Sequence, residues 1–476
     1  MEENRMKYRL ESDSLGERRV PREVYYGIQT ARAVQNFPMT GITIAQFPNL
    51  IKALASVKKA AAMANMELGI LEHKIGDAIV RACDEIRNGT LSEHFVVDVI
   101  QGGAGTSTNM NANEVIANRA LEIMGHKRGE YQHCHPNNHV NLSQSTNDVY
   151  PTALKIASVW DIEKLLKAMD KLKGAFEEKG GEFADILKIG RTQLQDAVPM
   201  TLGQEFEAYG ITLGEGVKAL KDATREICGI NMGATAIGTG INTVEGYAEK
   251  VRFLLADITG LPLYTEPNLV EATSDTGAFV QLSGVLKRVA IKLSKICNDL
   301  RLLSSGPRAG IGEINLPSRQ PGSSIMPGKV NPVIPEVVNQ VCFQVIGNDV
   351  TVTLAAEGGQ LELNVFEPIL GFNIFQSIEM LERACTVLRE RCILGITANR
   401  GRCQQLVESS VSLVTALSPF IGHENAARIA RKALETGRPV RELALESGLI
   451  DEERLKDVLD PRKMTHPRSI TGSGKT

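Results

Sequence analysis

One segment rich in glycine, proline and serine carries the residues best suited to chemistry. Gly322 to Pro332 reads GSSIMPGKVNP, so Ser323 and Ser324 precede Lys329, and Asn331 follows it. Lys329 supplies a positive charge and Asn331 a neutral donor. A serine becomes a base only where a cation and backbone N–H groups stabilise its alkoxide. The spacing fits an anion site with a serine base, and it fits a structural turn equally well.

Two other segments place small and hydroxyl residues just before an expected helix. They are Gly102 to Ser107 (GGAGTS) and Ser143 to Asp148 (SQSTND). Free N–H groups at a helix start bind anions, so both segments are candidates for an anion cradle. Capping by Ser145, Thr146 or Asn147 explains the second segment as well. No βαβ pattern surrounds the first, so a dinucleotide loop is not expected.

Two further patterns indicate little. His133, His135 and His139 lie in one expected loop without a second group of ligands, so we predict no metal site. The tail Gly472 to Thr476 (GSGKT) resembles half of a phosphate loop, but Ser469 stands where the first glycine is needed.

Long helices must position these segments. Apolar residues from Phe279 to Leu303 alternate in steps of three and four, and similar seams cover residues 162–176, 202–220 and 334–345. This predicts a mainly α protein with a long central helix bundle. Such helices have surplus apolar faces, so we expect a homo-oligomer held through the seam from Phe279 to Leu303, with a single-chain bundle as the alternative.

The regions between and beyond the seams define the expected organisation. Four segments rich in small residues should be irregular: Gln101 to Asn113, Asn137 to Pro151, Gly190 to Gly203 and Gly306 to Pro332. Past about residue 400 short amphipathic pieces predict a small helical appendix. We expect an N-terminal mostly helical domain (1–145), a central long-helix domain (146–400) and a small C-terminal helical domain (401–476).

Composition narrows the function classes. The 476 residues carry a net charge of −3, so no basic surface for nucleic acid or anionic lipid is expected. No apolar run is long enough to span a membrane, and Met1 to Leu10 is charged. The eight cysteines form no CxxC pair and read as reduced thiols. These features predict a cytoplasmic protein.

The loop GSSIMPGKVNP resembles the signature loop of the aspartase/fumarase superfamily. The resemblance extends to QGGAGTSTNMNANEV (101–115), SQSTNDVYPT (143–152), KIGRTQLQDAVPMTLGQE (188–205) and KICNDLRLLSSGPRAGIGEINLP (295–317). It implies a three-domain, mostly helical chain that assembles as a homotetramer around its long helices. It also implies active sites built from loops of three subunits.

Differences within the superfamily favour the aspartase branch. Similar fumarases have paired serines where Ser145 and Thr146 stand, and histidine where Gln193 stands. The segments 271–275 (EATSD) and 359–368 (GQLELNVFEP) also resemble aspartase sequences. In contrast, His135-Pro136-Asn137 resembles the accessory anion site of fumarases. The resemblance implies elimination of ammonia from L-aspartate to give fumarate, and the alternatives are a class II fumarase or a non-catalytic structural relative.

The resemblance also implies a role for each matching residue. Ser323 would be the general base, and Gln193 a neutral contact in place of a histidine relay. The α-carboxylate ligands would be Lys329, Asn331 and Thr192; the β-carboxylate ligands Thr106, Ser145, Thr146 and Ser324; and the amino-group contact Asn147. No organic cofactor or metal is required, and activation by Mg2+ is left open.

Overall fold

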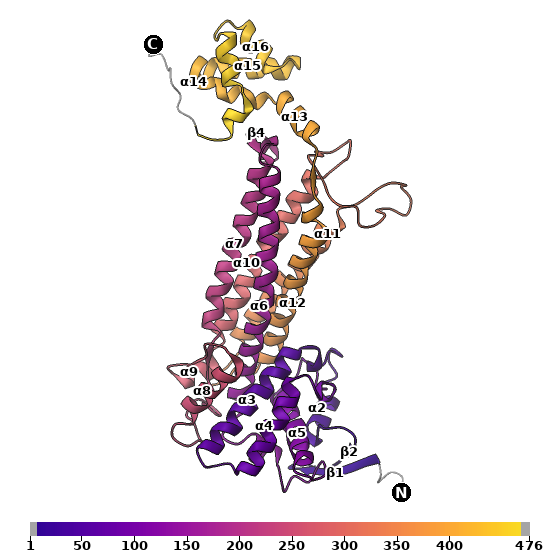
Figure 1. Ribbon diagram of the computed structural model, residues 1–476, viewed down its shortest axis with the longest axis vertical. Helices are drawn as coiled ribbons and strands as arrows, with labels where there is room; N and C mark the ends of the chain where they lie inside the picture. The colour runs from indigo at the N-terminus through magenta and orange to yellow at the C-terminus, as the bar shows by residue number, and fades with distance from the viewer. Residues whose placement is uncertain (1–6, 468–476) are drawn as a thin grey trace. The chain divides into compact units, whose positions relative to one another are not determined.

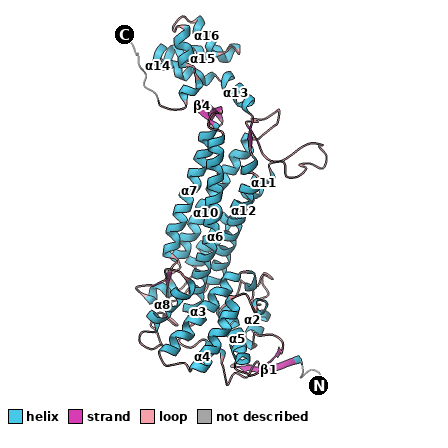
Figure 2. Cartoon of the chain, viewed as in Figure 1, coloured by secondary structure: helices cyan, strands magenta, loops and turns pink. Residues whose placement is uncertain are grey.

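A computed structural model describes residues 7–467 and is mainly helical (Figure 1). Among the described residues, strands occur only in four two-stranded sheets. Figure 2 colours strands magenta and helices cyan. The prediction of a mainly α fold is confirmed.

The first part of the described chain is a small ribbon followed by four helices. The elements are β1 (Tyr8–Asp13), β2 (Gly16–Pro21), α2 (Ile28–Asn36), α3 (Pro48–Glu67), α4 (His73–Arg87) and α5 (Thr106–Ile123). β1 and β2 pair antiparallel from Tyr8 opposite Pro21 to Asp13 opposite Gly16.

Long helices follow, as the apolar seams predict. They are α6 (Thr146–Glu182), α7 (Leu202–Glu226), α10 (Gly277–Leu303), α11 (Val333–Glu357) and α12 (Glu367–Arg391). The connecting helices α8 (Tyr247–Thr259) and α9 (Leu269–Ser274) lie between α7 and α10 in sequence. The expected C-terminal appendix consists of α13 (Arg400–Ser409), α14 (Ser418–Ile421), α15 (His423–Thr436), α16 (Val440–Glu446) and α17 (Glu452–Val458).

The chain divides into two compact units. Unit 1 holds residues 1–167, 216–291 and 341–382, and unit 2 holds 168–215, 292–340 and 383–476. Each of the five long helices contributes residues to both units. The domain boundaries expected at residues 145 and 400 stay a prediction.

Polar contacts join neighbouring long helices inside each unit. In unit 1, Ser283 of α10 donates to Asp349 of α11 at 2.8 Å. In unit 2, the amide of Asn339 on α11 donates to Ser294 Oγ on α10 at 2.8 Å. A buried polar group that lacks a hydrogen-bond partner costs free energy, so these two bonds favour one register of α10 against α11.

The seam from Phe279 to Leu303 corrects one expectation. Its members Phe279, Leu282, Leu286, Val289, Leu293, Ile296, Leu300 and Leu303 are all buried within a single chain. The expectation that this seam itself faces other subunits is therefore wrong, because the other helices of the same chain already cover it.

Three of the four segments expected to be irregular contain regular structure. Gly190 to Gly203 is mostly the hairpin of β3 (Leu187–Thr192) and β4 (Gln195–Thr201), followed by the start of α7. Gln101 to Asn113 becomes helical at Thr106. Asn137 to Pro151 contains most of a short π-helix (Pro136–Val140) and the start of α6. These segments were predicted to be loops because they are rich in small residues. The prediction failed because small residues also occur at helix starts and in tight hairpins.

Gly306 to Pro332 is irregular as expected, apart from β7 (Ile314–Asn315), which pairs with β8 (Thr397–Ala398). All eight cysteines are free and buried, in agreement with the sequence analysis. Within residues 7–467, no helix combines the length and the apolar character needed to cross a membrane. The GSGKT tail lies outside the described residues.

Candidate active site

The loop from Gly322 to Pro332 is closed by its own ends. Gly322 N–H donates to the carbonyl of Lys329 at 2.7 Å, and the side-chain amide of Asn331 donates to the carbonyl of Gly322 at 2.7 Å. A side chain on Gly322 would collide here, because an added Cβ would lie 2.7 Å from the Lys329 carbonyl oxygen. Glycine is therefore required at position 322, because the two ends of the loop approach each other closely there.

Ser323 lies inside this closed loop. Its Oγ accepts hydrogen bonds from the backbone N–H groups of Ile325 at 3.2 Å and Met326 at 3.0 Å. Both donors favour a negatively charged oxygen over a neutral hydroxyl. Lys329 and Ser324 are exposed, so they are free to meet a ligand. The arrangement provides the N–H groups that a serine base requires.

Ser145 and Asp148 form a capping box at the start of α6. Ser145 N–H donates to Asp148 Oδ1 at 3.0 Å, and Asn147 N–H donates to Ser145 Oγ at 3.2 Å. Asp148 also accepts from the N–H groups of Gly233 and Thr235, at 3.1 and 3.0 Å. The capping interpretation of this segment is therefore correct, and it fixes the backbone on which the candidate ligands stand.

Asp148 is fully buried, and it interacts electrostatically with the buried Lys58. Burial raises the pKa of Asp148 to about 6, against the lowering effect of its backbone donors and of Lys58. Burial lowers the pKa of Lys58 to about 7. Lys58 Nζ donates to Asn141 Oδ1 at 2.8 Å and to Gln144 Oε1 at 2.9 Å. Lys58 thus fixes the segment that precedes α6 through Asn141 and Gln144.

Thr146 and Asn147 are each held by a second element. Thr146 Oγ1 is buried and accepts from the side-chain amide of Asn109 on α5 at 3.0 Å. The Asn147 amide donates to the carbonyl of Ala236 at 2.7 Å. The bond to Thr146 joins the segment that begins α5 to the segment that begins α6.

Thr106 is the first residue of α5 and is exposed. Its Oγ1 donates to the carbonyl of Gly103 at 2.7 Å. The preceding Gly105 has φ of +86°, and a Cβ there would lie 2.3 Å from the ring of Tyr150. Glycine is needed at this position both for the left-handed backbone and for the contact with α6.

Thr192 and Gln193 lie at the tip of the β3–β4 hairpin and are exposed. Gln193 and Leu194 form a two-residue turn, and both have positive φ, 55° and 63°. Non-glycine residues rarely adopt this conformation, and such strain tends to occur at functional sites.

The strand before this turn is anchored by buried charges. Arg191 Nη1 lies 2.9 Å from Oε1 of Glu313, whose side chain is fully buried. Lys188 Nζ lies 3.0 Å from the other oxygen of Glu313, outside hydrogen-bond geometry, and 2.5 Å from Glu205 Oε2. Removing one member of such a buried network leaves an uncompensated charge, so the network stabilises the position of β3.

His135 does not offer a free ring nitrogen at Nδ1. That atom accepts from the N–H groups of Asn137 and Asn138 at 3.0 and 3.2 Å, and burial together with His139 lowers the pKa of the ring. A cavity of about 500 Å³ lies beside this turn, and its lining includes Asn137, Asn138 and Ser145. The resemblance to an accessory anion site stays a prediction.

The predicted site residues fall into two groups. Thr106, Ser145, Thr146 and Asn147 belong to unit 1, and Thr192, Gln193, Ser323, Ser324, Lys329 and Asn331 belong to unit 2. The structure brings the first group together through Asn109. Within residues 7–467 of one chain, no hydrogen bond or ion pair joins the Thr192–Gln193 turn to the loop that carries Ser323.

Sequence reasoning missed the residues that position these groups. Asn109, Asp148 and Asn231 hold the starts of α5 and α6, and Arg191 and Glu313 anchor the hairpin. All except Asn231 lie inside the quoted resemblance segments, so the motifs contained most of the signal. Their partners are distant in sequence, and spacing alone could not assign them.

Comparisons with known proteins agree with the motifs. A family described as Lyase matches residues 16–347, and one described as Fumarase C C-terminus matches residues 413–466. The aspartate ammonia-lyase of Pseudomonas fluorescens is 61% identical over 97% of each chain. That of Escherichia coli K12 is 55% identical over 96% of each chain.

Two solved structures have folds similar to that of this chain. A fumarate lyase:delta crystallin from Brucella melitensis, bound to cobalt, has a TM-score of 0.94 and 58% identity, covering 97% of this chain and 100% of its own. A class II fumarase from Schistosoma mansoni has the same TM-score and coverage at 37% identity.

Proposed function

Because the chain belongs to the aspartase/fumarase superfamily, we propose that it eliminates ammonia from L-aspartate to give fumarate. The aspartate ammonia-lyases at 55–61% identity and the lower identity of the class II fumarase support this branch. The reaction is reversible, so L-aspartate, fumarate and ammonia are the small molecules that the site handles.

The proposed mechanism begins with proton abstraction by Ser323. The observation that carries this assignment is the pair of backbone N–H groups that donate to Ser323 Oγ. The alkoxide removes a proton from the carbon next to the β-carboxylate. The electron pair moves into that carboxylate, which becomes an aci-carboxylate with a second negative charge.

Several neutral donors then stabilise the doubly charged group. We assign this role to Thr106, Ser145, Thr146 and Ser324; preorganised donors of this kind each contribute roughly 3 to 4 kcal/mol in mutational losses. Lys329, Asn331 and Thr192 bind the α-carboxylate, and Gln193 is a neutral contact. As the aci-carboxylate collapses, the carbon–carbon double bond forms and the carbon–nitrogen bond breaks, so ammonia leaves from beside Asn147. The substrate's own carboxylate is the electron sink, and no organic cofactor or metal is required.

We also propose a homotetramer in which three subunits contribute loops to each site. Apolar side chains on α11 support this assembly. Phe343, Val350 and Leu354 are spaced by seven and four residues on one helix face, and they are 60%, 58% and 64% exposed. Exposed apolar stripes of this kind mark protein interfaces. The eight free, buried thiols support a cytoplasmic enzyme, because thiols stay reduced there.

One assay separates the candidate functions. The purified protein is given L-aspartate alone or L-malate alone, and fumarate is followed by its ultraviolet absorbance. We expect fumarate from aspartate. Fumarate from malate alone would instead identify a fumarase, and no fumarate from either would identify a structural relative.

A further inference from the structure

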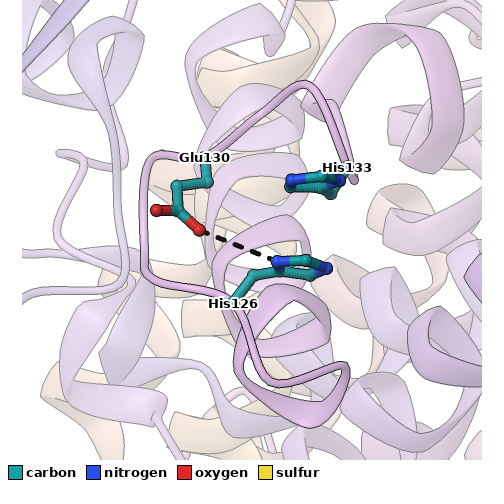
Figure 3. Close-up of side chains that lie close together, drawn as sticks. All are labelled: His126, Glu130 and His133. Atoms are coloured by element: carbon teal, nitrogen blue, oxygen red, sulfur yellow. Dashed lines mark ion pairs between the residues drawn. The ribbon is translucent and has the colours of Figure 1, made fainter.

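A cluster of two histidines and a glutamate lies after α5, apart from the candidate catalytic residues. His126, Glu130 and His133 each offer one ligand atom, and the three atoms lie within 4.8 Å of one another (Figure 3). His126 Nδ1 lies 3.7 Å from Glu130 Oε2. Sequence analysis grouped His133 with His135 and His139 and predicted no metal, so this grouping appears only in the folded chain.

We propose that His126, Glu130 and His133 form a binding site for a divalent transition metal ion. Two imidazoles and one carboxylate suit borderline ions such as Zn2+, Co2+ and Ni2+, and they leave positions for water. Mg2+ prefers an all-oxygen shell and fits this donor set poorly.

The backbone that carries the three ligands is held in place before any ion binds. α5 ends in a Schellman motif, because His126 N–H donates to Leu121 O at 2.9 Å and Gly125 N–H donates to Glu122 O at 3.0 Å. Gly129 N–H donates to Asn118 Oδ1 on α5 at 2.8 Å. The turn therefore has a fixed position against the helix, and an ion would pay little to order it.

The Glu130 carboxylate is oriented by the turn itself. Lys127 N–H donates to Glu130 Oε2 at 3.0 Å, and His133 N–H donates to the Glu130 carbonyl at 3.1 Å. The nearby Arg128 is committed elsewhere, since its Nε donates to Glu122 Oε1 at 2.7 Å. The carboxylate is thus preset by a backbone donor, as second-sphere contacts preset metal ligands.

Binding needs one side-chain rotation. The rings of His126 and His133 are stacked, with centroids 3.8 Å apart and planes within 9°. Nitrogen lone pairs lie in the ring plane, so one ion cannot bond both stacked rings. His133 is exposed, and within the described chain its imidazole makes no hydrogen bond or ion pair. It is therefore the ring that turns to complete the site.

The test uses Co2+ as the probe, because its visible d–d bands change in position and intensity when imidazole replaces water. The full-length protein is titrated with Co2+ alone, followed by absorbance and calorimetry, and its melting temperature is measured with and without Co2+. We expect one strong site per chain and a rise in melting temperature with Co2+. Affinity should fall at least tenfold in His126→Gln and in His133→Gln.

Two further variants complete the design. His423→Gln removes an exposed histidine that is outside the cluster, and it should bind Co2+ like the parent. Glu130→Gln changes only charge, so it serves where a histidine variant fails to fold, and it should also weaken binding at least tenfold. Equal affinity in the parent, Glu130→Gln and His133→Gln, or no strong site in the parent, would overturn the proposal.

Discussion

The main-chain carbonyl of Asn147 accepts a hydrogen bond at 3.0 Å from the side-chain amide of Asn231. In a regular helix this carbonyl would accept from the N–H four residues on, but that residue is Pro151, which has none. Asn231 thus replaces a missing helix bond and holds the residue that we assign to the amino group of the substrate.

Replacing Asn231 by alanine should damage both stability and catalysis. The buried carbonyl loses its donor, so the free energy of unfolding should fall by about 1–3 kcal/mol. Displacement of Asn147 should lower kcat/KM about tenfold, because small misplacements of a ligand are costly. Thermal unfolding and steady-state kinetics measure the two effects. Asn88→Ala, at an exposed asparagine, is the matched control; a destabilised Asn231→Ala enzyme with parental kcat/KM would exclude the positioning role.

Ser323→Ala should nearly abolish turnover while leaving the fold intact. Ser323 is partly exposed, and its hydroxyl accepts from backbone N–H groups of its own loop, so its removal leaves no buried cavity and breaks no contact with another element. Loss of a general base lowers kcat by about a hundredfold or more. Circular dichroism should be unchanged. Ser318→Ala, at an exposed serine of the same irregular segment, should keep full activity, and a Ser323→Ala enzyme with more than about a tenth of parental kcat would contradict the assignment.

Lys329→Arg should impair catalysis far more than stability. Lys329 is exposed, so the melting temperature should shift little. A planar guanidinium spreads its charge and cannot replace a compact ammonium beside the alkoxide. We expect kcat/KM to fall at least about tenfold, or about 1.4 kcal/mol, and the rising limb of the pH–activity profile to move. Parental efficiency with an unmoved limb would show that Lys329 only tethers the loop.

Subunit mixing tests the proposed sharing of sites. Thr106 lies in unit 1 and Ser323 in unit 2, and we expect Thr106→Ala and Ser323→Ala proteins each to be inactive. If the two residues of one site come from different subunits, co-refolding equal amounts should restore activity in about a quarter of the sites. Co-refolding each variant with itself is the control. Hybrids that form, as shown by differently tagged chains, yet recover no activity would contradict the shared site.

Glu367→Gln should flatten the pH dependence of stability. Glu367 is fully buried, and burial raises the pKa of its carboxyl to about 8, against the opposing charge of Lys155. The folded chain therefore holds a proton that the unfolded chain releases above its ordinary pKa near 4.5. Its contribution to stability is present below pH 4.5 and is lost as pH rises through about 8.

Glutamine cannot ionise, so the Glu367→Gln protein should not lose stability at this position as pH rises. The melting temperature of Glu367→Gln relative to the parent should rise steadily between about pH 5 and pH 8, measured by thermal unfolding across that range. The exposed Glu362→Gln is the control and should follow the parent. A constant difference over the range would show that Glu367 is ionised in the folded protein.

The long helices could be predicted from the amino-acid pattern alone, whereas the chemistry assigned to the loop at Ser323 stays a prediction. Apolar residues at helical spacing over many turns leave few alternatives, so the seam from Phe279 to Leu303 was assigned correctly to one long helix, α10. The same loop motif indicated the superfamily, because glycine, proline, serine and lysine stand where one closed loop needs them. The hairpin at Gln193 was missed, since its left-handed turn lacks the usual Asn-Gly signal.

The neighbours of each of these residues became known from the fold. Periodicity shows that a helix face is apolar, but whether the same chain or another chain covers it depends on packing between distant segments, so the face of α10 was assigned wrongly. For the same reason the bonds from Asn109 to Thr146 and from Asn231 to Asn147 could not be predicted, because the partners are separated by 37 and 84 positions in the sequence. The grouping of His126 with Glu130 and His133 likewise depends on how the turn after α5 folds back, which their spacing of four and three residues along the chain does not fix.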